Sequence, residues 1–352
     1  MRWPPIPTQD STPLRFPKSA VQKKHIYIYS PSGAVRDKAA FKRGIARLKT
    51  LGHEVEVDQD ALASHMRFAG NDETRLAAIH RATASGADVA LISRGGYGLT
   101  RILGGINYKA VAKAIDNGML FVGISDFTAF SLAVLARTGK VTWAGPGLCE
   151  GFGVGGKPDD ADGHGHGEDV VPDDIMEDCF NDLITGQGEG AGWRQNREPA
   201  ENAMNSVAAH AYAKRIEATF RIKKATFWGG NLSILSSLVG TPYLPTIKGG
   251  VLFLEDVAEH PYRVERMLTQ LLHSGVLARQ KAIILGQFTE YKLVPHDKGF
   301  KLQTVVDWLR SQISIPVLTN LPYGHVATKV MLPVGATVEL AVEGRDALLF
   351  WG

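Results

Sequence analysis

The sequence has 352 residues, more than one compact core usually spans, so its length predicts two medium domains rather than one large one. Hydrophobic residues make up 44%, charged residues 21% and aromatic residues 8%, which excludes collagen-like, disordered and coiled-coil chains. Lysine and arginine (39) barely outnumber aspartate and glutamate (36), so the charge does not predict binding to nucleic acid or to a membrane surface. The two cysteines, Cys149 and Cys179, are too few for a disulfide scaffold and fit a reducing compartment.

Residues 1–24 are rich in proline and have no hydrophobic period, which predicts an extended arm. No apolar run of signal-peptide length precedes Lys23. The longest dense apolar segment, Ala129–Ala136, is far shorter than the roughly 18 residues of a membrane-spanning helix. We therefore expect a cytoplasmic protein.

Strands and helices are predicted to alternate from His25 to Ser125. Runs of β-branched and aromatic residues are followed by apolar residues at helical spacing that end near a glycine. This alternation predicts a parallel sheet with helices on both faces, and ligands of such sheets bind beyond the carboxyl ends of the strands. The predicted strands start at 25 and cover 54–57, 88–93 and 120–125, and the predicted helices cover 38–51, 75–83 and 110–116.

The rest of the chain divides at a stretch crowded with Gly, Asp, Glu and Pro, which contains His164 and His166 and predicts a linker with an insertion. Beyond it, short predicted strands (250–254, 282–285, 337–341) mix with helices near 261–274 and 302–313, a pattern typical of an α+β domain. The predicted organisation is an N-terminal arm (1–24), an α/β domain (25–150), a linker and insertion (151–192) and a C-terminal domain (193–352).

Ser125 stands between a predicted strand and a helix that is apolar almost all round. A serine on such a turn exposes its hydroxyl above the sheet, and the helix N-terminus offers free N–H groups where an oxyanion forms. The residues Gly123–Phe127 lack the second glycine of the G-x-S-x-G elbow. The alternative interpretation of Ser125 is an ordinary helix cap.

Arg94–Gly98 (RGGYG) also follows a predicted strand, and its three glycines allow close approach of the backbone to a ligand. The loop lacks both the P-loop pattern and the third glycine of the dinucleotide fingerprint. Nucleotide binding is therefore the weaker interpretation of this loop.

Two further candidates come from the C-terminal half. Glu255 ends an apolar strand and could orient a histidine, or form a surface ion pair. His325 lies in a turn-rich loop, where a histidine is often merely exposed. Together with Ser125 they form an ordered set of nucleophile, orienting acid and general base. A metal site is not predicted, since H-E-x-x-H is absent and His164 and His166 lack obvious further ligands.

Five ordered blocks make the chain resemble the LD-carboxypeptidases, a serine peptidase family, and most closely its muramoyltetrapeptide carboxypeptidases of Gram-negative bacteria. The resemblance spans about residues 25–345. The blocks are SRGGYG (93–98), GISDFTA (123–129), FWGGNL (227–232) with GTP (240–242), LEDV (254–257) with the following EHPYRVERML (259–268), and GH (324–325) before LPVG (332–335).

The resemblance implies a fold and a set of site residues. The fold is an N-terminal α/β sandwich with a parallel sheet, followed by a β-rich C-terminal domain of the swivelling type, with the active site between them. The family's triad falls on Ser125, Glu255 and His325. We expect the oxyanion to be met by backbone N–H groups of Gly96 and Asp126. Expected substrate-binding residues are Arg94, Gly95, Tyr97, Trp228 and Asn231, although Arg94 could instead brace its loop, Trp228 could be a core residue and Asn231 could cap a helix.

The resemblance also implies an activity. Such enzymes are cytoplasmic, commonly dimeric and free of metal and cofactor, and they remove the terminal D-Ala from murein tetrapeptides during recycling of cell-wall fragments. Two alternatives stay open, a relative that cleaves a peptide-nucleotide antibiotic and a binding protein that has lost catalysis. The proline-rich arm and the stretch around 155–175 depart from the family pattern, which leaves dimer packing and access to the site open.

Overall fold

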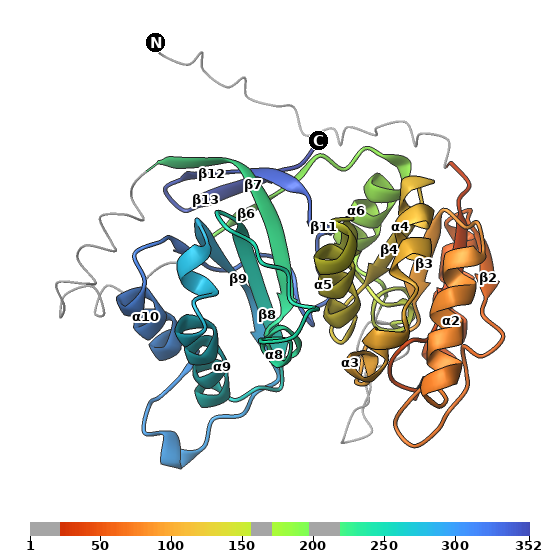
Figure 1. Cartoon of the computed structure of the whole chain (residues 1–352), viewed down its shortest axis with the longest axis horizontal. Coiled ribbons are helices and arrows are strands. Elements are labelled where there is room, and N and C mark those ends of the chain that lie inside the picture. Colours follow the sequence, from red (N-terminus) through yellow and green to blue (C-terminus); the bar gives the residue numbers. More distant parts are fainter. Residues whose placement is uncertain (1–21, 156–170, 197–218) are drawn as a thin grey trace, which may run out of the picture.

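The computed structural model describes residues 22–155, 171–196 and 219–352. Two bodies lie side by side, each built around one sheet, and helix α5 (Phe127–Thr138) lies between them (Figure 1). Within the described residues, no helix is long and apolar enough to cross a membrane.

The first sheet has six strands in the order β11-β5-β4-β3-β1-β2 among the described residues. The strands β2, β1, β3, β4 and β5 pair in parallel, whereas β11 comes from the C-terminal segment and runs antiparallel to β5. Parallel neighbours require crossover connections, which here contain helices, as the alternation of the sequence predicted. The strands are β1 (His25–Tyr29), β2 (Glu54–Val57), β3 (Val89–Ile92), β4 (Leu120–Gly123), β5 (Thr142–Ala144) and β11 (Leu332–Val334).

Helices cover both faces of this sheet because its strands alternate their buried side chains. In β1, Ile26 and Ile28 share a core with residues of α1 and α6, whereas Tyr27 and Tyr29 belong to the core formed with α2, α4 and α5. This arrangement is the predicted α/β sandwich. Its remaining helices are α1 (Lys38–Thr50), α2 (Asp72–Ala84), α3 (Leu99–Ile102), α4 (Tyr108–Asp116) and α6 (Asp174–Thr185).

Helix α6 lies in the stretch that the sequence predicted as linker and insertion, where no helix was predicted. The Asp173 side chain caps the helix by accepting a hydrogen bond from Met176 N, and Met176, Phe180 and Leu183 bury one face of it. The helix is preceded by a long Gly/Asp-rich run, which obscured its period. His164 and His166 lie outside the described residues.

The second sheet has seven strands in the order β10-β9-β8-β7-β12-β13-β6 among the described residues. The strands β7 to β10 pair in parallel, and β7, β12, β13 and β6 pair antiparallel. This mixed, β-rich sheet confirms the predicted α+β character. Its elements are β6 (Gly190–Arg194), β7 (Phe220–Asn231), β8 (Val251–Val257), β9 (Ala282–Thr289), β10 (Val317–Leu318), β12 (Thr337–Glu343), β13 (Asp346–Phe350), α8 (Leu232–Ser237), α9 (Pro261–His273) and α10 (Leu302–Gln312).

Helix α5 joins the two halves. All residues from Phe127 to Leu135 are buried, as the apolar sequence predicted, because the helix packs against its own sheet and also against β7 and α8. Phe130 therefore belongs to the same hydrophobic core as Phe227 and Trp228 of β7. This shared core fixes the start of α5 relative to the second sheet. The exact domain boundaries stay a prediction.

Candidate active site

Ser125 lies on the turn between β4 and α5, where the sequence predicted it. Its φ is +65°, in the left-handed region that residues with a side chain rarely adopt. Such a conformation costs on the order of 1–3 kcal/mol and persists only where the surroundings enforce it. A plain helix cap has extended backbone and needs no such strain. The geometry therefore favours the nucleophile-elbow interpretation of this serine.

The glycine loop Arg94–Gly98 packs directly on this turn. A Cβ atom placed on Gly95 lies 2.6 Å from Ser125 Cβ and 3.0 Å from Ser125 Oγ, so only glycine fits. The Gly95 carbonyl accepts a hydrogen bond from Gly33 N (3.2 Å). Because the peptide bond is trans, the Gly96 N–H points to the opposite side.

The backbone N–H groups of Gly96 and Asp126 donate no hydrogen bond to any acceptor in the described part of the chain. The Asp126 N–H also precedes the first turn of α5, where the helix dipole favours negative charge. Two free donors beside a strained serine are what an oxyanion hole requires.

The Asp126 side chain has a role that the sequence analysis did not assign. It is fully buried and accepts hydrogen bonds from Ser32 Oγ and from Leu99 N (2.9 Å). Burial raises the pKa of this carboxyl, and the two hydrogen bonds partly oppose the rise. Asp126 thus ties the serine turn to the segment around Ser32 and to the start of α3.

Glu255 and His325 form the pair that the sequence predicted. His325 Nδ1 lies 2.9 Å from Glu255 Oε2, and the glutamate side chain is 1% exposed. Burial alone would lower the pKa of His325, but the hydrogen bond to Glu255 and its charge raise it above the ordinary value. Since a carboxylate only accepts, Nδ1 carries the proton and Nε2 is left as the acceptor.

Asn231 and Asp256 extend the hydrogen-bond network of Glu255. The Asn231 amide donates to Glu255 Oε1 (3.2 Å) and to Asp256 Oδ1 (3.0 Å), and its carbonyl oxygen caps α8 by accepting from Ile234 N. The capping alternative for Asn231 is thus confirmed. Its contact with substrate stays a prediction, and the side chain is 3% exposed. Burial and the neighbouring Glu255 charge raise the pKa of Asp256 to about 6.

The structure joins Glu255 to His325 directly and Ser125 to the glycine loop by packing. No hydrogen bond between Ser125 Oγ and His325 is present among the described residues. The two halves of the site meet in the first turn of α5, where Thr128 Oγ1 accepts a hydrogen bond from Asn231 N (3.0 Å). A Cβ on Gly230 would collide with Thr128, which explains the glycine at that position.

Arg94 braces its own loop. Its guanidinium donates to Glu150 Oε1 (3.3 Å) and to the Ala34 carbonyl (3.3 Å). Glu150 is therefore the protein carboxylate that the alternative interpretation of Arg94 requires.

Tyr97 of the same loop is 45% exposed, and its ring centre lies 5.9 Å from that of Phe68.

Trp228 lies in the hydrophobic core. It is 1% exposed, and its indole N–H donates to Gln280 Oε1 (2.9 Å). The expected wall of the substrate pocket was wrong because strand β7 is covered at this position and the ring lies in the shared core. The alternative interpretation as a core tryptophan is the one that fits.

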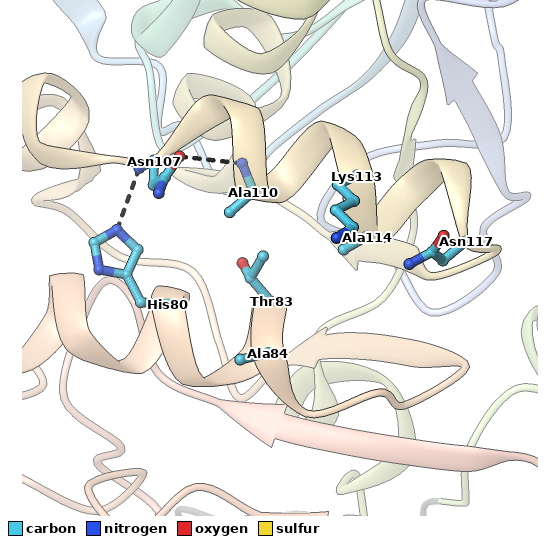
Figure 2. Close-up of a pocket in the computed structure, with 8 residues that line it drawn as sticks. All are labelled: His80, Thr83, Ala84, Asn107, Ala110, Lys113, Ala114 and Asn117. Atoms are coloured by element: carbon cyan, nitrogen blue, oxygen red, sulfur yellow. Dashed lines mark hydrogen bonds between the residues drawn. The ribbon is translucent and has the colours of Figure 1, made fainter.

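A surface pocket elsewhere lies between α2 and α4 (Figure 2). His80 Nε2 there accepts a hydrogen bond from Asn107 N (3.2 Å), and the Asn107 side chain caps α4. None of the triad residues lines it. Among the described residues, no group of three or more His, Cys, Asp or Glu side chains is placed to hold a metal ion.

Two models of known protein families match the chain. Residues 26–145 match the model of the LD-carboxypeptidase N-terminal domain, and residues 224–340 match that of the LD-carboxypeptidase C-terminal domain. The chain belongs to the LD-carboxypeptidase family. It is thus a member of a family of peptidases, and the resemblance inferred from the sequence blocks is confirmed.

Individual relatives agree along most of the chain. The crystal structure of muramoyltetrapeptide carboxypeptidase from Oxalobacter formigenes is 37% identical, has a TM-score of 0.76 and covers 93% of this chain and 98% of its own. A probable murein peptide carboxypeptidase of Bacillus subtilis is 27% identical over 303 residues, which are 86% of this chain and 84% of the relative. The microcin C7 self-immunity protein of Escherichia coli is 26% identical over 266 residues, 71% of this chain and 69% of the relative.

Proposed function

We propose that this protein is a serine LD-carboxypeptidase that releases the terminal D-Ala from murein tetrapeptides. The observation that carries the proposal is the hydrogen bond of 2.9 Å between His325 Nδ1 and the buried Glu255 Oε2, which leaves Nε2 free to act as a base. The strained Ser125 turn beside two free N–H donors supplies the matching nucleophile. The names of the relatives from Oxalobacter formigenes and Bacillus subtilis support the substrate class.

The mechanism begins with proton transfer from Ser125 Oγ to His325 Nε2. The serine oxygen attacks the carbonyl carbon of the residue before D-Ala, and a tetrahedral oxyanion forms. His325 then gives its proton to the leaving amine, D-Ala departs, and a water molecule activated by His325 hydrolyses the acyl-enzyme. Glu255 holds the imidazole in the required tautomer and stabilises its cation, because its carboxylate is buried against Nδ1.

The N–H groups of Gly96 and Asp126 are proposed to bind the oxyanion. They are preorganised, because Gly33 fixes the Gly95 peptide and the Asp126 side chain is anchored by Ser32 and Leu99. Preorganised donors of this kind are worth about 10² to 10³ each in kcat. We propose that Gly95 and the exposed Tyr97 lie against the substrate backbone.

Further parts of the proposal concern the setting of the reaction. We propose that the protein works in the cytoplasm as a homodimer, without a metal or other cofactor, and that it acts on fragments recycled from the cell wall. These parts are supported by the resemblance to the family. Sedimentation equilibrium tests the dimer, since a mass of one chain at micromolar concentration contradicts it.

The deciding experiment is mass spectrometry of a murein tetrapeptide that ends in D-Ala, incubated with the wild type and with Ser125→Ala in the presence of a chelator. We expect the wild type alone to remove one alanine, and Ser125→Ala to lose about 10⁴ to 10⁶ in kcat because the attacking oxygen is removed. Equal rates for the two proteins would contradict the serine mechanism. A wild-type rate abolished by the chelator would contradict metal independence.

A second candidate is cleavage of a peptide-nucleotide antibiotic. The observation in its favour is the 26% identity to the microcin C7 self-immunity protein. The same assay with an aminoacyl sulfamoyl adenosine as substrate tests it. Turnover of that compound with an intact tetrapeptide would favour this candidate, and turnover of neither would favour a binding protein without catalysis.

A further inference from the structure

Lys329 is a buried cation that the proposed mechanism does not use. It lies four residues after His325 in the same loop and is 2% exposed. Within the described residues, its ammonium group forms no hydrogen bond and no ion pair. Since burying an unpaired charge is costly, an anionic group that formed a hydrogen bond to this ammonium would be favoured.

The neighbours of Lys329 hold the loop in place. Thr328 Oγ1 donates to Asp173 Oδ2 (2.7 Å), and Val330 N donates to the Pro322 carbonyl (2.9 Å). Lys329 is therefore anchored from both sides along the chain while its own side chain is left without a partner. A mobile surface lysine would show neither property.

Lys329 shares its loop with the base His325, which lies four residues before it. Burial lowers the pKa of the Lys329 ammonium, and the charges of Glu150, Asp173 and Glu255 act in the opposite direction. Each already has another partner: Arg94 for Glu150, Thr328 for Asp173, and His325 for Glu255.

Glu150 connects this lysine with the glycine loop. Its charge also raises the pKa of His325, and it pairs with Arg94 beside Gly95. The charge of Glu150 thus acts on His325 and on Lys329, and it also pairs with Arg94 of the loop that packs on Ser125.

The Lys329 nitrogen also keeps contact with solvent. The nitrogen has no hydrogen-bond partner among the residues that the structure describes, but it is not fully enclosed by protein atoms. The small exposed fraction of the residue therefore includes this nitrogen. An anion that enters the site could reach it without unfolding the loop.

We propose that Lys329 binds a carboxylate group of the peptide substrate and is a specificity-determining residue of this site. The inference rests on the proposed carboxypeptidase function and deepens it. The two substrate carboxylates nearest the bond that breaks are the terminal carboxylate of D-Ala and the side-chain carboxylate of the diamino acid before it. Arg94, which the sequence predicted either to bind substrate or to brace its loop, is already paired with Glu150 and the Ala34 carbonyl.

The test compares Lys329→Met with the wild type on three peptides: the tetrapeptide, its D-Ala carboxamide, and an analogue with lysine in place of the diamino diacid. On the tetrapeptide we expect kcat/KM to fall about 10- to 100-fold, because a charge-assisted hydrogen bond is lost. On the peptide that lacks the bound carboxylate, the two proteins should become equal, and the peptide on which this happens identifies the source.

Two controls separate a binding role from a structural one. Lys329→Met should melt at an equal or higher temperature than the wild type, because an apolar side chain replaces an unpaired charge. Lys140→Met, which removes a partly exposed lysine paired with Asp116, should leave kcat/KM unchanged on all three peptides. Lys329→Arg should retain part of the preference for the carboxylate.

The same drop for Lys329→Met on all three peptides, or no drop on any, would overturn the inference while leaving the carboxypeptidase function intact. A wild-type protein that releases no alanine from the tetrapeptide would instead overturn the proposed function.

Discussion

The two halves of the site are built by different means. Around Ser125, the N-terminal half uses backbone: a serine at φ +65°, free N–H groups and glycines packed so closely that a Cβ does not fit. Around Glu255, the C-terminal half uses side-chain hydrogen bonds, which join the partly exposed His325 to the buried Glu255, Asn231 and Asp256.

This difference predicts which kind of substitution impairs each half of the site. The serine turn depends on shape, so a single added methyl group should misplace the nucleophile even though no charge changes. The glutamate network depends on protons, so an isosteric change that leaves every atom in place should still remove function. The following predictions test this distinction, from the largest expected effect to the smallest.

Glu255→Gln should lower kcat by about 10³ to 10⁴ without a large change of structure. The new amide either faces His325 Nδ1 with its NH₂ group, which moves the imidazole proton to Nε2, or meets the Asn231 amide as a second donor. A base protonated at Nε2 cannot accept the proton of Ser125, and the corresponding change in trypsin costs about 10⁴. Steady-state kinetics beside a thermal melt measures the effect.

The contrary result for Glu255→Gln is a folded variant with at least a tenth of the wild-type kcat. It would show that the glutamate merely packs against His325. The half of the site that we assign to proton chemistry would then depend on shape as well.

Gly95→Ala tests the other half and should lower kcat by about 10²-fold. The added Cβ would lie 2.6 Å from Ser125 Cβ, so the serine or the loop must shift, and displacements near 1 Å cost about this factor. The same enzyme assay measures it, together with a melting curve.

Gly188→Ala is the matched control. The same methyl group there meets nothing closer than 3.5 Å, and like Gly95 this glycine does not have a φ in the left-handed range. We expect wild-type kcat for this variant. If Gly95→Ala retained wild-type kcat as well, close packing on Ser125 would not be a requirement of the site.

Most of the fold was predictable because its signals are local. The strands and helices of the first half follow from apolar runs and helical periods that end at glycine, and the buried character of α5 follows from its uninterrupted apolar residues. Helix α6 was missed, since a Gly/Asp-rich run adjoins its short apolar face. Strand β11 was also missed, as its three residues, including Pro333, pair with a strand far away in the sequence.

The site divides in the same way. Ser125, Glu255 and His325 were identified from turn and strand-end positions together with the family blocks, and the 2.9 Å contact of the last two confirms their proximity. The supporting residues Ser32, Thr128 and Asp256 were not assigned, because their roles depend on contacts between segments distant in sequence. Trp228 was misplaced for a related reason: only the packing of both halves shows which side of a strand end is covered.

Asp256→Asn should give the smallest effect, a shift in the pH profile rather than a loss of activity. His325 must be neutral to act as a base, so kcat/KM falls as the pH drops through its pKa, which lies above the ordinary value of 6.5. Asp256 has a pKa of about 6, so above that pH its negative charge adds to that of Glu255 and helps to raise the pKa of His325. Removing the charge should therefore move the acidic limb to lower pH, by about a few tenths of a unit.

The variant should also be slightly less stable, because the Ser233 N–H loses one carboxylate oxygen as its acceptor, at a cost of about 1 kcal/mol. A full pH profile of kcat/KM from about 5 to 9 separates the two effects, since lost stability lowers the whole curve and a changed charge displaces its limb. A limb that stays in place or moves to higher pH would mean that Asp256 acts on His325 only through the hydrogen bonds of Asn231. The C-terminal half would then resemble the serine turn in depending on geometry rather than on charge.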